Sequence, residues 1–380
     1  MGRYTVLDDA GLDDKIERDM ALCRERVLDL FGDNLASLVL VGGYGRGEGG
    51  VAMSDGASCP INNYDFLIIL KVVRPWDVSK ITASLGKLKS ELDKKLLTLF
   101  EYSFRSIRQL RGAPHIMIYH DVCNASMTIY GESVEKLISP GVKKPLEVFE
   151  AVKIARNRGI LLLFSSPIID RRGYKATPEQ IRTWFSKAII GFGDSISILM
   201  GEYKTRYVDK MSVMENSSFP DVFESESDYR YFKKLHRAAS LYRLKSEDSP
   251  LLEDRDAIIV VLGKVHLWVM KRYLNDQNFD WGDLPGIGIR SRGSIKQFAR
   301  NLMANFSEYG FWRVSESLLF GVDAVLYHPA DKLFKVLPLL LYEMESDSGE
   351  VCARELGLDK GATVDAIRNE CVRIYNKYIA

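Results

Sequence analysis

The sequence of 380 residues contains only five cysteines, no Cys-x-x-Cys pair and no long hydrophobic run. An odd number of scattered cysteines excludes a framework in which every cysteine is paired, and the missing motif argues against a structural zinc site. The longer apolar runs, such as 159–164, 257–263 and 336–342, fall far below the roughly 20 residues that a bilayer-spanning helix needs. The first fifteen residues are too acidic and polar for a signal peptide. We therefore expect a soluble, cytoplasmic protein with reduced thiols.

The chain also has almost no net charge, because 52 lysines and arginines face 51 aspartates and glutamates. A formal charge of +1 argues against an extended nucleic-acid surface, which is usually strongly basic, but leaves room for local basic patches. The hydrophobic content of 46% is ordinary for a globular protein. The length exceeds the roughly 250–300 residues of a single core, so two domains are expected.

An unusual concentration of glycine follows the short apolar run Leu38–Val41. Residues 42–50 are GGYGRGEGG and contain six glycines. The apolar run has the length and branched content of a buried strand. Glycine lets the backbone approach a ligand closely and turn its amides toward an anion. The pattern therefore indicates a phosphate-binding bend, and a tight connection without a ligand is the simpler alternative.

A second apolar run, Phe66–Leu70, is preceded by two polar residues, Asn63 and Asp65, with one residue between them. Alternate side chains of an extended chain share one face, so we expect both to point the same way. An amide oxygen and a carboxylate beside a glycine bend suit a magnesium–nucleotide site. A strand-end aspartate that only caps a turn is the alternative.

Together the two motifs resemble the nucleotidyltransferase domain of the DNA polymerase beta superfamily. That superfamily places a Gly-Gly or Gly-Ser turn after one strand, two alternating acidic residues on the next strand, and a third acidic residue on a later strand. The most similar subgroup, of bacterial and archaeal enzymes, has a GGxGRGEG turn followed by Asn-Asp-Tyr-Asp. The matching positions here are Gly42, Gly43, Gly45, Arg46, Gly47 and Glu48 in the turn, and Asn62, Tyr64 and Asp65 before the second strand.

The chain departs from this pattern at Asn63, where the family has its first aspartate. The resemblance implies that Asn63 and Asp65 are metal ligands and catalytic residues. An amide oxygen can bind magnesium but is uncharged, so the loss of one carboxylate should weaken both metal binding and stabilisation of phosphate charge. Three explanations are open: a catalytically dead homologue that still binds nucleotide, an engineered knockout, or a tolerated change with slow turnover.

The third carboxylate that the resemblance implies is assigned to Asp121. Residues His115–Asp121 alternate like a strand, with Asp121 on the face of Met117 and Tyr119. In that position Asp121 would bind the metal and act as general base toward the acceptor hydroxyl. A plain strand-end aspartate is the alternative, and the neighbouring His120 could serve in its place.

The resemblance also gives roles to residues of the turn. Gly42 and Gly43 would let the β- and γ-phosphates of a nucleotide approach the backbone. Arg46 would pair with phosphate oxygens in a bidentate manner, and Glu48 would orient Arg46 or contact the water shell of the metal.

Two further polar residues lie in a region with helical periodicity. Lys187 and Asp194 are seven residues apart, which places them on one face of a helix. By analogy with related nucleotidyltransferases, Lys187 would contact the triphosphate and Asp194 would bind or deprotonate the acceptor. A buried polar pair that fixes helix packing is at least as good an interpretation.

The hydrophobic pattern predicts an α+β fold with a boundary near Pro140. We expect a nucleotidyltransferase domain in residues 1–140 and a helical domain in residues 141–380. Strands are predicted at 38–41, 66–70, 102–110, 115–121 and 127–130, and loops at 51–62 and 275–293. Helices are predicted at 11–31, 77–97, 145–165, 177–203, 227–245, 254–274, 294–308, 314–343 and 363–378, with a kink or break at Pro338. Helical-domain aromatics, Tyr203 among them, are expected mostly in the core.

The predicted activity is transfer of a nucleoside monophosphate from a nucleoside triphosphate to a hydroxyl or phosphate acceptor, with release of pyrophosphate. Mg²⁺ and a triphosphate donor, by default ATP, are the implied cofactors. The near-neutral charge favours a small-molecule acceptor, such as an aminoglycoside-like or sugar-phosphate compound, and a protein acceptor is a further alternative. The rival hypothesis, motivated by Asn63, is a catalytically impaired nucleotide-binding or regulatory module. A purely structural partner protein is the third.

Overall fold

The computed structural model describes residues 2–54, 56–164, 176–218, 221–223, 225–287, 301–305, 328–342, 346–359 and 361–378. These combine many helices with a small mixed sheet, which is compatible with the predicted α+β class. Contacts divide the chain into two compact units, neither of which is continuous in sequence. Unit 1 consists of Met1–Glu150, Met200–Asn216 and Ser240–Asp248, and unit 2 of Ala151–Leu199, Ser217–Ala239 and Ser249–Ala380. The predicted boundary near Pro140 stays a prediction.

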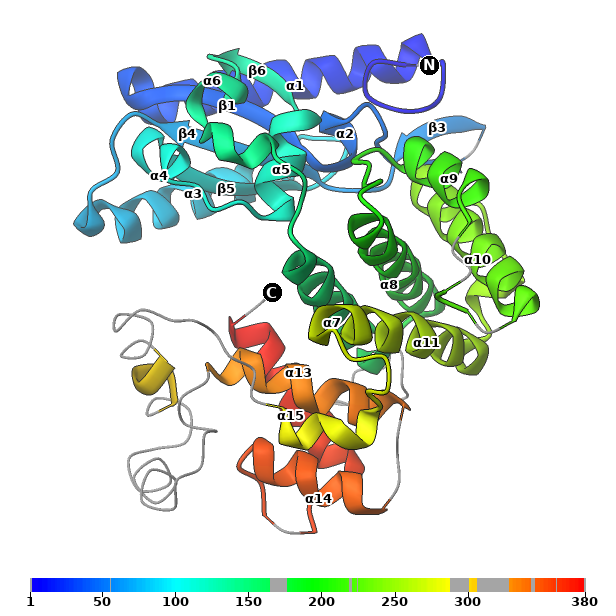
Figure 1. Ribbon diagram of the computed structural model, residues 1–380. Coiled ribbons are helices and arrows are strands. Elements are labelled where there is room, and N and C mark those ends of the chain that lie inside the picture. The colour runs from blue at the N-terminus through cyan, green and yellow to red at the C-terminus, as the bar shows by residue number, and fades with distance from the viewer. Residues whose placement is uncertain are drawn as a thin grey trace. The chain divides into compact units, whose positions relative to one another are not determined.

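A four-stranded mixed sheet lies at the centre of unit 1, in the order β5-β4-β1-β6 (Figure 1). Its strands are β1 (Leu35–Val41), β4 (Tyr64–Leu70), β5 (Phe100–Ser106) and β6 (Met127–Gly131). β1 pairs antiparallel with β4 and β6, whereas β4 and β5 are parallel and are joined through helix α3 (Val78–Leu92). The strands predicted at 38–41, 66–70 and 127–130 are confirmed. The strand predicted at 102–110 ends at Ser106, which begins helix α4 (Ile107–Arg111) with a capping box.

Helices cover both faces of this sheet, because the side chains of each strand alternate between them. On the first face, α1 (Ala10–Phe31) and α3 pack against strand residues such as Leu40, Phe66 and Ile68. On the second face, Leu67 and Ile69 pack with α4, α5 (Met117–Asn124) and α6 (Val134–Leu137). Each fully buried leucine, isoleucine or phenylalanine contributes roughly 1.5–3 kcal/mol to folding. Burial on two sides therefore fixes the register of the sheet, and with it the positions of the strand ends.

Two segments of unit 1 differ from the sequence prediction. The strand predicted at 115–121 is wrong, because most of this segment belongs to helix α5. Ile118 is 61% exposed whereas Val122 and Cys123 are buried, which is a helical rather than an alternating pattern of burial. The loop predicted at 51–62 contains a hairpin of β2 (Val51–Ser54) and β3 (Ala57–Pro60).

Helices make up most of the rest of the described chain. They are α7 (Val148–Phe164), α8 (Pro178–Leu199), α9 (Tyr207–Asn216), α10 (Glu226–Lys245), α11 (Arg255–Leu274), α13 (Pro329–Tyr342), α14 (Ser346–Glu355) and α15 (Val364–Tyr378). The predicted helices 145–165, 177–203, 227–245, 254–274 and 363–378 are confirmed, whereas α9 and α14 are not predicted. α9 and the C-terminal end of α10 belong to unit 1. Short helical turns occupy Gly32–Asn34, Gly42–Gly45 (α2), Pro75–Asp77, Pro140–Lys143, Pro250–Leu252 and Trp281–Gly286.

The remaining predictions fall near residues that the structure does not describe. α13 continues through Pro338, so the helix does not break at that proline, and the kink predicted as the other possibility stays a prediction. Residues 301–305 are helical, and the rest of the helix predicted at 294–308 lies outside the described residues, as do 314–327 and 288–293. No helix in the described part of the chain combines the length and the apolar character needed to cross a membrane.

Candidate functional site

The glycine-rich bend lies directly beside the carboxylate of Asp65. Gly42–Gly45 form the one-turn helix α2, which Arg46 closes by donating its backbone N–H to the carbonyls of Gly42 and Gly43, each at 3.2 Å. Gly42 has a φ of +68°, a conformation that favours glycine. A methyl group added to Gly42 would lie 2.5 Å from Asp65 Oδ2. The backbone of Gly42 therefore lies close to the Asp65 carboxylate, and no side chain at position 42 separates them.

Strand pairing explains this contact. Asp65 is the Cα partner of Val41 in the antiparallel ladder, so the start of β4 lies beside the end of β1, where the bend begins. Packing also requires glycine at further positions of the segment. A methyl group would lie 2.2 Å from the carbonyl oxygen of Leu40 on Gly45, 2.1 Å from the Tyr44 ring on Gly49, and 2.8 Å from the carbonyl oxygen of Arg243 on Gly50. Close packing of the turn, the simpler alternative for these glycines, therefore holds at Gly45, Gly49 and Gly50.

The sheet places a second carboxylate next to Asp65, one that the sequence analysis misses. Glu101 is the Cα partner of Asp65 in the parallel β4–β5 pair, so both side chains start from the same face of the sheet. Glu101 accepts a hydrogen bond from Lys89 at 2.9 Å. A sequence signal exists, because Glu101 directly precedes the predicted strand 102–110. Adjacent parallel strands begin at the same edge of a sheet, which would have brought the two acidic residues together.

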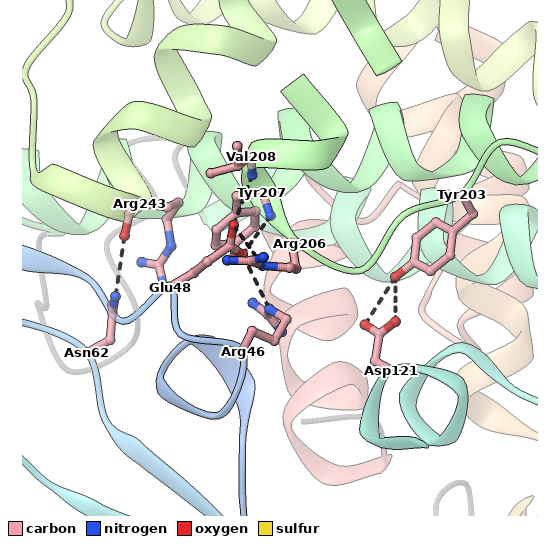
Figure 2. Close-up of polar contacts among 9 residues, drawn as sticks. All are labelled: Arg46, Glu48, Asn62, Asp121, Tyr203, Arg206, Tyr207, Val208 and Arg243. Carbon is pink, nitrogen blue, oxygen red and sulfur yellow. Dashed lines mark hydrogen bonds and ion pairs between the residues drawn. The ribbon is translucent and has the colours of Figure 1, made fainter. Parts of the chain in front are cut away.

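The other predicted metal ligands lie in different settings. Asn63 is exposed and directly precedes β4. Asp121 lies on α5, where both of its oxygens accept the hydroxyl of Tyr203, at 2.8 and 3.0 Å (Figure 2). Tyr203 is thus half-buried and bonded to a carboxylate, and is not the core aromatic that we expect from the sequence.

The donor set can be tested against the chemistry of magnesium. Among the described residues, no three acidic, histidine or cysteine side chains lie close enough together to hold a metal ion. Magnesium in proteins usually keeps several waters and needs only one or two carboxylates beside substrate phosphates. Asp65 and Glu101, with the amide oxygen of Asn63, are hard oxygen donors of that kind. They fit Mg²⁺ bound together with a nucleotide, and not a closed protein-only metal site.

Glu48 has a role in unit 1 that its sequence position does not reveal. Its carboxylate is buried and accepts the backbone N–H groups of Tyr207 and Val208, at 2.7 and 3.0 Å. These are the first two residues of α9, whose N-terminal N–H groups have no partner within the helix. Glu48 also lies 3.7 Å from Arg46 Nε. Of the two roles predicted for Glu48, the geometry agrees with orienting Arg46, and it adds the capping of a distant helix.

Arg46 and Tyr207 face each other at the end of the bend. The Arg46 guanidinium lies over the Tyr207 ring, with Cζ 5.1 Å from the ring centroid (Figure 2). Burial alone would lower the pKa of Arg46, but Tyr207, Asp121 and Glu48 outweigh it and raise the pKa above its usual value. Arg46 is therefore held as a cation at the edge of the glycine bend.

Lys187 and Asp194 both lie on α8. Lys187 is exposed and Asp194 is buried, and the alternative interpretation of a polar pair that fixes helix packing stays a prediction. The roles assigned to Lys187 toward a triphosphate and to Asp194 toward an acceptor stay predictions.

Comparison with known proteins adds no further assignment. No protein-family model matches the chain, and a search of curated proteins finds no match either. The function is therefore inferred from the motifs and from the geometry of the site.

Proposed function

We propose that the chain is a magnesium-dependent nucleotidyltransferase that moves a nucleoside monophosphate from a nucleoside triphosphate to a hydroxyl or phosphate acceptor. The observation that supports this most is the contact between Asp65 and Gly42, with 2.5 Å between Oδ2 and the position of an added methyl group. A phosphate held at the glycine bend would lie next to a carboxylate, which is the arrangement that metal-assisted phosphoryl chemistry requires. The proposed fold and activity are those of the DNA polymerase beta superfamily that the motifs resemble.

The proposal assigns separate tasks to the residues at the bend. The Gly42 and Gly43 backbone would accommodate the β- and γ-phosphates, and Arg46 would neutralise their charge. Asp65 and Glu101 would hold Mg²⁺, which supplies charge neutralisation at the reacting phosphate when bound. Asp121, bonded to Tyr203, is the remaining candidate for accepting the proton of an acceptor hydroxyl. Positioning and electrostatics would account for most of the rate.

A second candidate function rests on Asn63. This residue is exposed beside the start of β4, so an aspartate there would meet no packing obstacle and could add the missing charge. Without that charge, the protein would be a nucleotide-binding or regulatory module with little or no turnover. For the enzyme, small molecules with a hydroxyl or phosphate group are the proposed acceptors, because the chain is close to neutral.

The test is pyrophosphate release with Mg²⁺ and each nucleoside triphosphate in turn, comparing the natural chain with Asn63→Asp and with Asp65→Asn. Activity of the natural chain that is lost in Asp65→Asn supports the enzyme. Nucleotide binding by both chains with turnover by Asn63→Asp alone supports the impaired module. Calorimetry that finds no affinity for any triphosphate in either chain would leave the structural-partner hypothesis and overturn the proposal.

A further inference from the structure

Four cationic side chains from three parts of unit 1 surround one tyrosine. Arg46 Cζ and Lys210 Nζ lie 5.1 and 5.6 Å from the centroid of the Tyr207 ring. Arg243 hydrogen-bonds the Tyr207 side chain, and Arg206 directly precedes it. Figure 2 shows Arg46, Arg206 and Arg243 converging on this ring. We call Arg46, Arg206, Lys210 and Arg243 the cationic cluster.

The carboxylates near the cluster already have hydrogen-bond partners. Glu48 caps α9 through both of its oxygens, and Asp121 accepts the Tyr203 hydroxyl through both of its own. The Nε atoms of Arg46 and Arg243 are buried and find no hydrogen-bond acceptor among the described residues. Glu48 lies 3.7 Å from Arg46 Nε and 3.9 Å from Arg206 Nε, as ion pairs rather than hydrogen bonds. A buried donor without a hydrogen-bond acceptor is costly, so the Nε atoms of Arg46 and Arg243 favour an additional anion at the cluster.

The cationic cluster favours a negative charge at its centre, as the Tyr207 hydroxyl shows. Burial would raise the pKa of Tyr207, but Arg243, Arg46 and Lys210 outweigh it and lower the pKa below the usual value of a phenol. The site is also reachable, because the Arg206 side chain is 38% exposed. An anion could therefore approach from solvent on the Arg206 side and find arginine donors already in place.

We propose that the cationic cluster binds a phosphoryl group of a substrate. Arginine presents its donors in a planar fork that matches two phosphate oxygens, and lysine adds a compact charge. This proposal adds a phosphoryl-binding site to the proposed function. It rests on the proposed function only for the identity of the reaction in which the bound group takes part. The phosphoryl group would belong either to a phosphorylated acceptor, such as a sugar phosphate, or to the triphosphate donor.

The experiment is a calorimetric titration of the full chain with pyrophosphate, for the natural protein, Arg206→Gln, Arg243→Gln and the control Arg24→Gln. Arg24 is an exposed arginine on α1 and is not part of the cluster. Arg24→Gln therefore removes the same charge as the cluster variants do, at a site outside the cluster. Each cluster variant should raise the Kd at least about tenfold, which corresponds to about 1.4 kcal/mol. Arg24→Gln should stay within about twofold of the natural chain, as expected for an exposed charge.

The source of the phosphoryl group is found by titrating glucose 1-phosphate with and without a saturating non-hydrolysable ATP analogue. If the sugar phosphate binds alongside the analogue, and Arg206→Gln weakens it, the cluster holds the acceptor. If the analogue displaces the sugar phosphate, and Arg206→Gln weakens the analogue, the cluster holds the donor. Either result supports a phosphoryl site.

Pyrophosphate binding that is absent, or equally tight in the natural chain and both cluster variants, would overturn the proposal. Arg206 is partly exposed, so Arg206→Gln keeps the test valid even if Arg243→Gln fails to fold, as monitored by circular dichroism. Failure of the two proposals can be told apart. Phosphate binding that depends on the cluster, without any nucleotide transfer, would overturn only the proposed function. If Asp65→Asn abolishes nucleotide transfer but the cluster variants bind phosphate as tightly as the natural chain, only the proposal of a phosphoryl site is overturned.

Discussion

The carboxylate of Glu48 accepts the backbone N–H of Tyr207 at 2.7 Å, across 159 residues of sequence. The same carboxylate accepts the N–H of Val208, so it replaces the local serine, threonine or aspartate that usually caps a helix. A negative charge at a helix N-terminus is also favoured by the helix dipole. The glycine-rich bend therefore determines where α9 begins.

Replacing Glu48 should destabilise unit 1. Glu48→Ala removes a buried acceptor of two N–H groups and the carboxylate that lies 3.7 Å from Arg46 Nε, which should cost about 2–4 kcal/mol. Glu48→Gln keeps one carbonyl acceptor and should cost less. Urea denaturation followed by circular dichroism measures both, with the exposed Glu25→Ala on α1 as control. An alanine variant at position 48 as stable as the Glu25 control would contradict the capping role.

Gly42→Ala should disturb the site more than the fold. The new methyl group would press against Asp65 Oδ2, and alanine at a φ of +68° is strained by roughly 1–3 kcal/mol. Calorimetry should show that triphosphate affinity falls at least about tenfold, since moving the carboxylate alters the metal site. The matched control is Gly86→Ala on α3, where an added methyl group meets open space. That change should stabilise the protein by about 0.5–1 kcal/mol and leave nucleotide binding as it was.

The proposed role of Glu101 as a magnesium ligand can be tested separately from its ion pair with Lys89. If Glu101 helps to hold magnesium, Glu101→Gln should raise the Mg²⁺ concentration needed for triphosphate binding by about tenfold. Lys89→Met breaks the same 2.9 Å ion pair but leaves the carboxylate, so it should not raise that concentration. Magnesium titrations at fixed nucleotide give the comparison. Equal responses of the two variants would show that Glu101 matters only through its pairing with Lys89.

Unit 2 should lose stability in mild acid because of His266. Burial among Phe192, Trp281 and Tyr342 lowers the pKa of His266 to about 3. Since the unfolded chain has a histidine pKa near 6.5, it binds a proton between these values that the folded chain does not. Stability is therefore fully present above pH 6.5 and declines toward pH 3, by about 2 kcal/mol at pH 5.

Urea unfolding at pH 7.5 and pH 5.0 measures this loss. His266→Phe preserves ring packing but cannot titrate. Its free energy of unfolding should therefore fall by about 2 kcal/mol less than that of the natural chain between pH 7.5 and pH 5.0. An identical pH dependence in the natural chain and in His266→Phe would show that another group is responsible.

The sequence predicts the long elements well because their periodicity is sustained. Leu12, Ile16, Met20 and Val27 follow one another at helical spacing and are all buried on α1. The segment 115–121 is too short for this, and its alternating isoleucines fit a strand as well as a helix. Only the burial of Val122 and Cys123 by neighbouring elements distinguishes the two, and that is tertiary information. The hairpin at 51–60 is missed for a different reason, because each strand is only four residues long and Ser54, Gly56 and Pro60 indicate a loop.

The candidate site is predicted only in part, for a related reason. Asp65 lies next to the bend because the two motifs occupy consecutive paired strands. Glu101 directly precedes a predicted strand, but it is missed because the sequence pattern does not specify that this strand pairs in parallel with β4 through the crossover α3. The partners of Arg46 and Glu48 are missed because Tyr207 is some 160 residues away, and no local pattern connects them.

Unit 1 is completed only when the ribosome has passed Asp248, although its sheet is encoded before residue 132. At roughly 5–20 residues per second, the roughly 100 residues after Glu150 take about 5–20 seconds to synthesise. Until α9 has been synthesised, part-way through that interval, the nascent chain presents the Glu48 carboxylate and the Arg46 guanidinium without Tyr207 and Val208. If the bend binds a nucleotide as proposed, the nucleotide can engage it before the polypeptide is finished.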